Sequence, residues 1–411
     1  MAKILPFKAV RPVRAKAGLV ASRPYEDYSE AELTAQLEFN PYSFLHIINP
    51  GYKFQQNLKG GQRFQMVKNR YLEFKEEETF IQEKNPAYYI YKVKSRDSSI
   101  NGIIAATSTE DYEENVIKRH EDTINHRELL FKDYLKTVGF NTEPVLLTYP
   151  DNEDINCIMR EVMKSRPEYE FATPNRELHY LWVIDQPGLI EKIRKEFEKT
   201  PQLYIADGHH RCASSYRLAQ ESKEQNAAHT GEEPYNFFMS YLISESNLKI
   251  HEFSRLIKNL NGLSKEEFLI LLDESFRIEN RGLEVYRPSK KHHFNMYLDG
   301  EYYSLYLRKT NYEFTDSLSK LDSYILYQKV LKPILGIEDL RHDERIAYCH
   351  GRNDLIELKT RIDGGEFAVG FGMLPVSIEE IKEIAEEDLT MPPKTTYIEP
   401  KLRSGLTIYE F

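Results

Sequence analysis

The sequence is poor in cysteine, with only Cys157, Cys212 and Cys349 in 411 residues. Their odd number and wide spacing argue against a disulfide framework and do not fit a zinc site. We therefore expect reduced thiols and a cytoplasmic protein. Long apolar runs are also missing, since no stretch approaches the roughly 18 apolar residues that a membrane-spanning helix needs. The first residues, Met-Ala-Lys-Ile-Leu-Pro-Phe, lack the pattern of a signal peptide.

The common nucleotide-binding signatures are absent as well. The chain has no Walker box, no dinucleotide fingerprint and no internal repeat. An excess of positive charge is missing too, because 55 Lys and Arg residues face 65 Asp and Glu residues, which gives a net charge of −10. This balance argues against broad nucleic-acid binding, although a local basic patch is compatible with it.

The chain is long and rich in aromatic residues, with 28 tyrosines and 21 phenylalanines. This is enough for a sizeable core and for two or three domains. We expect an α/β core over 1–245 that carries the functional site and an α+β second domain or insertion over 246–375. The carboxy-terminal helix and tail over 376–411 would pack back on the site.

The order of the elements predicts an α/β fold, α+β overall, with a mixed sheet. A strand at 179–184, a helix at 187–199 and an apolar strand end at 203–206 precede a further helix. Open sheets of this kind bind ligands at the carboxyl ends of their strands. Asp299-Gly300, between alternating apolar residues, predicts a hairpin in the α+β portion.

Other local signals predict single elements. Ser29 has the character of a helix N-cap, with Glu32 at the capping-box position. The apolar and charge patterns further predict paired strands at 87–93 and 101–106, a strand at 44–48, and a long charge-rich helix at 111–139.

The most informative stretch is Asp207-Gly208-His209-His210-Arg211, between a buried strand end and an amphipathic helix. Gly208 allows a tight turn and a close approach of the backbone to a ligand. The helix start offers N–H groups and a positive dipole end, which favour an anion. Arg211 and the two histidines add donors, and Asp207 could hold Mg²⁺ or accept a proton. Each residue alone fits an ordinary helix start. Together they predict a phosphate-binding turn that also takes part in a reaction.

Two further charged groups are candidates with an ordinary alternative. Glu26 and Asp27 lie between a strand and a helix, where they are either catalytic acids or N-terminal charges on the helix. Lys118, Arg119 and His120 form a dense cationic trio. They belong either to an exposed face with salt bridges or to a set of contacts with the phosphate donor.

The remaining candidates are predicted to bind the substrate. Arg23 and Tyr25 adjoin the acidic pair, and Lys394, Thr395 and Thr396 belong to a tail rich in proline, lysine and hydroxyl groups. Tails of this composition usually fray. If this tail is ordered, its lysine and threonines could close over an anion.

The sequence resembles, essentially end to end, the bacterial and archaeal family called domain of unknown function 1015. The resemblance rests on several unusual strings: Pro6-Phe7-Lys8-Ala9-Val10-Arg11-Pro12, Pro24-Tyr25-Glu26-Asp27, Asn40-Pro41-Tyr42-Ser43-Phe44-Leu45, Lys118-Arg119-His120-Glu121, Ile205 to Arg211, and Met391-Pro392-Pro393-Lys394-Thr395-Thr396.

A more distant resemblance concerns the turn alone. Asp207 to Arg211 looks like the signature of the ParB and sulfiredoxin superfamily, in which a Gly-x-x-Arg turn at a helix start binds nucleotide phosphates. The resemblance implies a ParB/sulfiredoxin-like nucleotide-binding core. Sulfiredoxins place their reactive cysteine just before the His-Arg pair, where this chain has His209, and Cys212 follows Arg211. ParB proteins add a helix-turn-helix DNA reader, for which this sequence gives no clear case.

The free-serine kinases of that superfamily carry a similar string, and the resemblance therefore implies a small-molecule kinase. It would transfer a phosphoryl group from ATP, ADP or pyrophosphate to a hydroxyl, with free L-serine as the leading acceptor and O-phosphoserine as the product. A transcription regulator or DNA-linked switch of the ParB kind and a non-catalytic nucleotide sensor remain as alternatives. The partners would be small molecules rather than a membrane or nucleic acid, and a homodimer is compatible with the sequence.

The kinase hypothesis assigns roles to the candidate residues, and the resemblance itself implies that an N-terminal acid is the base. His209, His210, Arg211 and the helix N–H groups would hold the donor phosphates, with His210 also among the catalytic residues. Asp207 would bind Mg²⁺ or orient the attacking hydroxyl. Either Glu26 or Asp27 would be the general base. The transferring group or the acceptor carboxylate would be held by Lys118, Arg119, His120 and Lys394.

Overall fold

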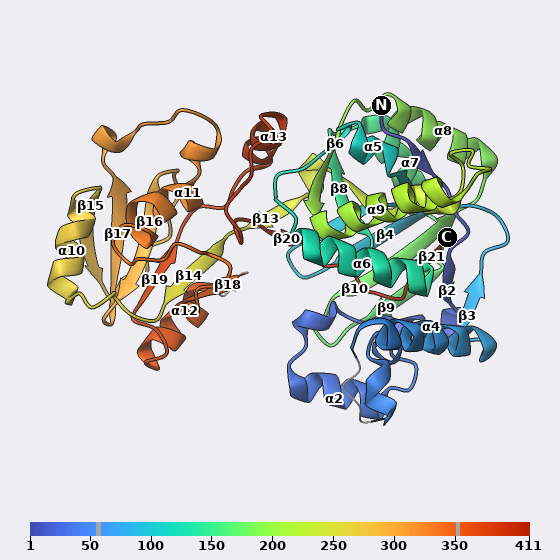
Figure 1. Cartoon of the computed structure of the whole chain (residues 1–411), viewed down its shortest axis with the longest axis horizontal. Helices are drawn as coiled ribbons and strands as arrows, with labels where there is room; N and C mark the ends of the chain where they lie inside the picture. The colour runs from blue at the N-terminus through green and yellow to red at the C-terminus, as the bar shows by residue number, and fades with distance from the viewer. Residues whose placement is uncertain (55–58, 351–353) are drawn as a thin grey trace. The chain divides into compact units, whose positions relative to one another are not determined.

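The computed structural model describes residues 1–54, 59–350 and 354–411 (Figure 1). The chain forms two compact units. The first contains residues 1–119, 123–248 and 400–411, and the second contains residues 120–122 and 249–399. Each unit has its own sheet and its own hydrophobic core.

The first unit is built on a mixed sheet, which has nine strands in the described part of the chain. Eight of them follow the order β6-β11-β8-β12-β5-β4-β10-β9, and β1 pairs with β5. The strands are β1 (Ile4–Leu5), β4 (Tyr88–Lys94), β5 (Ser99–Ser108), β6 (Ile117–Lys118), β8 (Val145–Tyr149), β9 (Tyr169–Ala172), β10 (Leu178–Ile184), β11 (Leu203–Asp207) and β12 (Phe237–Ser244). The pairs β6–β11 and β8–β12 are parallel and the others are antiparallel. The predicted α/β fold with a mixed sheet is confirmed.

Helices and two short strand pairs complete the first unit. The helices are α1 (Ala17–Val20), α2 (Glu30–Phe39), α3 (Leu45–Ile48), α4 (Gly60–Glu76), α5 (Glu110–Glu113), α6 (Asn125–Val138), α7 (Glu153–Val162), α8 (Pro187–Glu198) and α9 (His209–Gln225). The strand pairs are β2 (Val10–Pro12) with β3 (Phe80–Gln82), and β7 (Phe140–Asn141) with β21 (Tyr409–Glu410). Helices α6 and α9 lie side by side (Figure 1).

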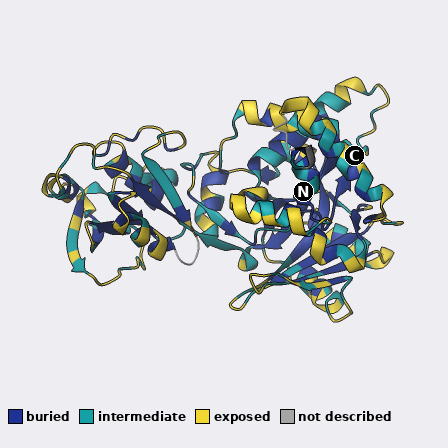
Figure 2. Ribbon diagram, turned by 90° about the horizontal axis from the view of Figure 1, so that it is seen from below, coloured by how far each residue is buried: buried dark blue, intermediate teal, exposed yellow. Residues whose placement is uncertain are grey.

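The core of the first unit explains why these segments form strands and helices. Apolar side chains of the central strands, such as Ile90, Leu147 and Ile205, are fully buried. They pack against Ile155 of α7 and Phe197 of α8. Burying each such side chain contributes about 1.5–3 kcal/mol. Figure 2 shows buried strands and helices whose outer faces are exposed. No helix within the described residues is both long enough and apolar enough to cross a membrane.

The second unit is built on an antiparallel sheet, with six strands among the residues described, in the order β15-β17-β16-β19-β14-β18. Its elements are β13 (Lys249–His251), β14 (Phe253–Ile257), α10 (Lys265–Asp273), β15 (Phe276–Gly282), β16 (His293–Leu298), β17 (Glu301–Leu307), α11 (Asp322–Leu326), β18 (Ile346–His350), α12 (Asp354–Asp363), β19 (Val369–Gly372), α13 (Ile378–Glu386) and β20 (Tyr397–Glu399). Strand β13 pairs with β20 outside the large sheet. Leu298 pairs with Glu301 across Asp299-Gly300, so the predicted hairpin is confirmed.

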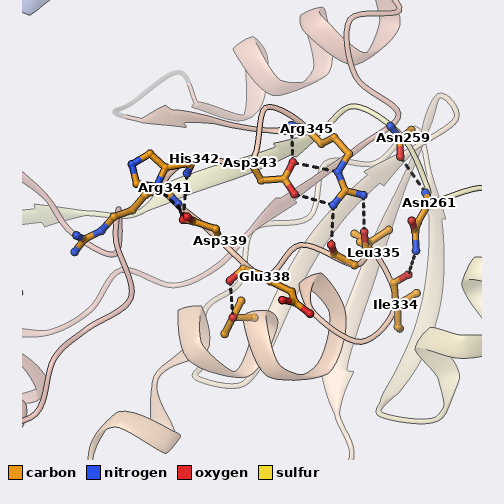
Figure 3. Close-up of polar contacts among 12 residues, drawn as sticks. Asn259, Asn261, Ile334, Leu335, Glu338, Asp339, Arg341, His342, Asp343 and Arg345 are labelled. Carbon is orange, nitrogen blue, oxygen red and sulfur yellow. Dashed lines mark hydrogen bonds and ion pairs between the residues drawn. The ribbon is translucent and has the colours of Figure 1, made fainter.

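Arg345 holds the loop that leads into β18 (Figure 3). Its guanidinium pairs with the carboxylate of Asp343 at 2.7 Å and donates to the carbonyl oxygens of Leu335 at 3.0 Å and Gly336 at 2.7 Å. These carbonyls lie at the end of the turn that follows the π-helical segment Tyr327–Leu331. Asn261 donates to the neighbouring Ile334 carbonyl at 3.2 Å. The carbonyls of residues 334–336 are therefore held by side chains from two different segments of the chain.

Local predictions succeeded where one short-range signal decides the structure. Ser29 and Glu32 form the predicted capping box at the start of α2. The strands predicted at 87–93 and 101–106 are β4 and β5, and they pair antiparallel as expected.

Two local predictions are wrong. The stretch 44–48 forms the helix α3 (Leu45–Ile48), with Phe44 as its N-cap, rather than a strand. A short apolar run cannot by itself distinguish the two. The stretch 111–139 is not one helix, because Ile117 and Lys118 form β6 and pair with Leu203 and Tyr204 of β11. Ile117 is buried in the core, so packing against the sheet overrides helix propensity there.

Asp322 gives a prediction about stability and pH. It is 2% exposed at the start of α11, and its Oδ1 accepts the His292 N–H at 2.8 Å. Burial raises the pKa of Asp322 to about 7, while its ordinary value of about 3.9 applies to the unfolded chain. The folded chain therefore binds the proton more tightly, and the free energy of unfolding falls as the pH rises from about 4 to about 7. In Asp322→Asn, the fall in the free energy of unfolding between about pH 4 and about pH 7 should be smaller by up to about 4 kcal/mol.

Urea unfolding at acidic and at mildly alkaline pH measures how much the free energy of unfolding changes between the two, for the parent and for the variant. Asp316→Asn is the control, since Asp316 is exposed in the same segment and should leave the decrease in place. If Asp322→Asn loses stability with rising pH as steeply as the parent, Asp322 is not the group responsible.

Candidate functional site

The turn at 207–211 has the predicted strand-to-helix geometry. Strand β11 ends at Asp207, α9 begins at His209, and Gly208 between them has a φ of 98°. A Cβ on Gly208 would lie 2.9 Å from Nε and 3.0 Å from Cζ of Arg211. Glycine is therefore required both by the backbone angle and by the guanidinium folded over it.

Asp207 holds Arg211 and a lysine from the end of the chain. Arg211 Nη2 lies 2.7 Å from Asp207 Oδ2, and Lys401 Nζ lies 3.1 Å from Oδ1. Arg211 Nη1 also donates to the Pro144 carbonyl at 2.8 Å and lies 3.8 Å from Glu143. Burial favours the neutral acid, but the charges of Arg211 and Lys401 outweigh it and lower the pKa of Asp207 to about 2. Asp207 is thus an anion that fixes two cations, and it is too acidic to serve as a base at neutral pH.

The residues after Gly208 are mostly buried. His209 is 5% exposed, and burial lowers its pKa to about 4 against the opposing charge of Asp207. Its ring is therefore neutral at pH 7 and is a hydrogen-bonding group rather than a cation. His210 stands in the first turn of α9, where its carbonyl accepts the Ser214 hydroxyl. Burial raises the pKa of the Cys212 thiol, so this cysteine has no reactive thiolate.

A cavity of about 360 Å³ opens beside the turn within the first unit. Its polar lining consists of Tyr25, Glu26, Arg63, Asn141, Thr142, Glu143, Arg211, Ser214 and Ser215. Its apolar lining includes Ile48, Phe64, Val67, Leu130, Phe131, Tyr134 and Leu135. A cavity with a largely apolar wall and a few convergent polar groups is the usual form of a small-molecule site.

The cavity separates the two acids that sequence reasoning left as alternatives. Tyr25, Glu26 and Asp27 form a single 3₁₀ turn. Tyr25 and Glu26 line the cavity together with Arg211, whereas Asp27, although described, is outside its lining. Arg23 also lies outside it and pairs with Glu32 at 3.0 Å, its guanidinium 4.2 Å from the Tyr28 ring centroid.

The cationic trio is divided between the two units. Lys118 lies on β6, opposite Tyr204 of β11. Strand β6 is therefore the neighbour of the strand that leads to the turn at 207–211. Arg119 donates to the Tyr112 hydroxyl at 3.2 Å, and its charge contributes to lowering the pKa of His209. His120 belongs to the second unit, where its carbonyl accepts the Met391 N–H at 2.9 Å.

The predicted tail residues are ordered in the second unit. Lys394 has a φ of 57°, and its carbonyl accepts a hydrogen bond from Arg255 at 3.1 Å. Thr395 is buried and donates to the Pro392 carbonyl at 2.7 Å. Thr396 follows it, just before β20. Closure of this tail over an anion stays a prediction.

Sequence reasoning missed Lys401, Arg63 and Glu143. Lys401 reaches Asp207 because residues 400–411 belong to the first unit, where β21 pairs with β7. Arg63 and Glu143 line the cavity from α4 and from the loop before β8. None of them lies in a motif, and only the tertiary fold brings them to the turn.

A magnesium ion has few protein ligands available here. The described residues hold no group of three His, Cys, Asp or Glu side chains that could bind a metal. Both oxygens of Asp207 are paired with cations. Magnesium is often held by one or two carboxylates and the substrate phosphates. Asp207 therefore fits this metal only as a single ligand, with the phosphoryl donor supplying the others.

Gly208→Ala should destabilise the turn. Alanine at a φ of 98° is strained, and its Cβ would push against Arg211. We expect a loss of about 1–3 kcal/mol in the free energy of unfolding, measured in urea. Gly188→Ala is the matched control, because a Cβ there meets nothing within 4 Å and it lies in α8. Equal stabilities of the two variants would show that the turn tolerates a side chain.

Comparisons with known proteins give a family and several remote structural neighbours. A family model described as "Protein of unknown function (DUF1015)" matches residues 4–324 and confirms the family predicted from the motif strings. A search of the curated proteins finds no match.

Three solved structures illustrate the neighbours. A conserved hypothetical protein from Pyrococcus furiosus is 13% identical, covers 74% of this chain and 94% of its own, and has a TM-score of 0.37. A free serine kinase in complex with AMP is 11% identical, with coverages of 75% and 90% and a TM-score of 0.35. SbnI with a C-terminal truncation, from Staphylococcus aureus, is 12% identical, with coverages of 74% and 86% and a TM-score of 0.39. Similarity at this level establishes neither a shared ligand nor a shared activity.

Proposed function

The chain belongs to the DUF1015 family, and we propose that it is a small-molecule kinase. It would transfer a phosphoryl group from ATP, ADP or pyrophosphate to a hydroxyl group, with free L-serine as the leading acceptor and O-phosphoserine as the product. The DNA-linked switch and the nucleotide sensor have no specific observation in their favour.

One observation carries the proposal: Glu26 and Arg211 line the same cavity, although they come from distant parts of the sequence. A kinase needs a cation for the transferring phosphoryl group and a base or orienting group for the acceptor hydroxyl, and both must reach one ligand. The 360 Å³ cavity supplies a common space of small-molecule size.

The donor phosphates would be held by the turn. Arg211 is already oriented by Asp207, and its guanidinium can bind two phosphate oxygens at once. The first N–H groups of α9, a 17-residue helix, add donors and a positive dipole end. The neutral ring of His209 and the ring of His210 would donate hydrogen bonds. Lys118 and Arg119 would add charge from the neighbouring strand and loop. Mg²⁺, with Asp207 as its protein ligand, would supply further neutralisation of the donor charge when bound.

The acceptor hydroxyl would be oriented and deprotonated by Glu26. Asp207 is a poor choice for that role because its pKa is about 2 and both of its oxygens are ion-paired. Tyr25 lines the cavity next to Glu26 and would contact the acceptor. Arg23, Asp27, His120, Lys394, Thr395 and Thr396 remain predicted contacts of the acceptor or the donor.

The test is phosphoryl transfer in the presence of Mg²⁺, with ATP, ADP and pyrophosphate each offered against a panel of amino acids and polyols. Formation of O-phosphoserine, lost in Arg211→Ala, would support the proposal and its location. Transfer to a different hydroxyl would keep the kinase and replace the acceptor. Nucleotide binding without transfer to any acceptor would favour the sensor, and a shift of a DNA probe at moderate salt would favour the switch.

A further inference from the structure

A second cavity, of about 230 Å³, lies within the second unit at the start of α12. Six of its lining residues carry the inference: His251, Glu252, Arg287, Asp354, Gly372 and Met373. All of them belong to residues 249–399, so the cavity is formed entirely by one compact unit.

The cavity is lined by two carboxylates, those of Asp354 and Glu252. Asp354 is 3% exposed, and its Oδ2 accepts the Ser254 hydroxyl at 2.8 Å. Its ion pair with Arg287 is long, at 3.7 Å, and the Arg287 side chain is 58% exposed. Glu252 lies near enough that, after burial, the charge of Asp354 helps to raise the pKa of Glu252. His251 pairs with Glu399 at 3.4 Å, and the charges of His251 and Arg287 oppose the rise in the pKa of Glu252. The buried Arg255 also interacts with the charge of Glu252.

An unsatisfied amide, which is not itself part of the lining, lies beside the lining residue Gly372. Asn295 of β16 is fully buried, and within the described residues neither its Nδ2 nor its Oδ1 has a hydrogen-bond partner. Asn295 pairs with Gly372 of β19, so its side chain shares the sheet face on which the cavity lies. A Cβ on Gly372 would stand 3.4 Å from Ser254 Oγ and 3.7 Å from Asn295 Cβ. Because buried amides almost always have partners, this one points to a missing polar group.

We propose that the cavity binds a small molecule of amino-acid size that carries a primary ammonium group, held between Asp354 and Glu252. An ammonium group offers three donors, which suits a cavity lined by two carboxylates. The Asn295 amide would bond a polar substituent of the same molecule, and Arg287 at the rim would meet a carboxylate where the ligand has one. A metal ion is a poorer occupant, since no described cluster of three His, Cys, Asp or Glu residues could hold it. This site is independent of the kinase proposal.

Isothermal titration calorimetry on the full chain tests the site, with putrescine, ethanolamine and the standard amino acids as probes and acetate as the anionic control. At least one ammonium compound should bind saturably. Asp354→Asn should weaken that binding about tenfold or more, because it removes one charged hydrogen-bond partner while keeping an acceptor for Ser254. Glu357→Gln is the matched control on the same helix, paired with Arg361 at 3.5 Å with a side chain 48% exposed, and should leave the affinity unchanged.

Glu252→Gln is a second variant that does not depend on how well Asp354→Asn folds, and it should also weaken binding. Saturable binding by none of the compounds would overturn the proposal, as would binding that persists in both variants. A ligand lost in Arg211→Lys but retained in Asp354→Asn would belong to the first unit and would equally overturn it.

Discussion

Glu26→Gln should lower kcat for phosphoryl transfer by about 10²–10⁴, the usual contribution of a positioned general base. The change removes a proton acceptor and preserves size, so the cavity that Glu26 lines should keep its shape. The KM for the phosphoryl donor should change little, because the donor is assigned to the turn at 207–211. Steady-state kinetics with each donor, together with calorimetric binding of that donor, separates the two effects.

Asp27→Asn is the matched control for this variant. Asp27 follows Glu26 in the same 3₁₀ turn, has the same charge, and lies outside the cavity lining. It should retain nearly full activity. If Asp27→Asn is the inactive variant and Glu26→Gln is active, the cavity is not where the hydroxyl is deprotonated, and the base has been assigned to the wrong acid.

The geometry of the turn at 207–211 could be predicted from the sequence because its residues are contiguous. Gly208, the polar residues around it and the strand and helix that flank it all lie within one short segment, and the structure has the expected positive φ at Gly208. Local rules apply at that scale. The capping box of Ser29 and Glu32 was predictable for the same reason.

The rest of the site depends on the tertiary fold. Nothing in the sequence distinguishes Glu26 from Asp27, because the difference is which side chain faces the cavity. Lys401 has no motif of its own and meets Asp207 only because the end of the chain belongs to the first unit. Lys118 was placed on a helix because the segment is rich in charge, and the pairing of β6 with β11 was not visible locally. Intrinsic strand propensity alone does not predict which strands pair when they lie far apart in the sequence.

Arg211→Lys should lower kcat/KM by about 10²–10³, as the loss of a positioned donor to transition-state charge does elsewhere. Lysine keeps the charge but has a single ammonium group. It cannot contact Asp207, the Pro144 carbonyl and a phosphate in the fixed geometry that the guanidinium provides. The loss should therefore appear even though net charge is unchanged, which distinguishes geometry from simple electrostatic attraction.

The same substitution at Arg217 is the matched control. Arg217 lies on the same helix and pairs with Glu128 rather than with the turn. Arg217→Lys should keep kcat/KM within a few-fold of the parent, and both variants should unfold at similar urea concentrations. Equal activity in the Arg211 and Arg217 variants would mean that the turn supplies charge without orientation. Asp207 fixes the guanidinium of Arg211 before any ligand binds, so such a result would show that this orientation does not contribute to catalysis.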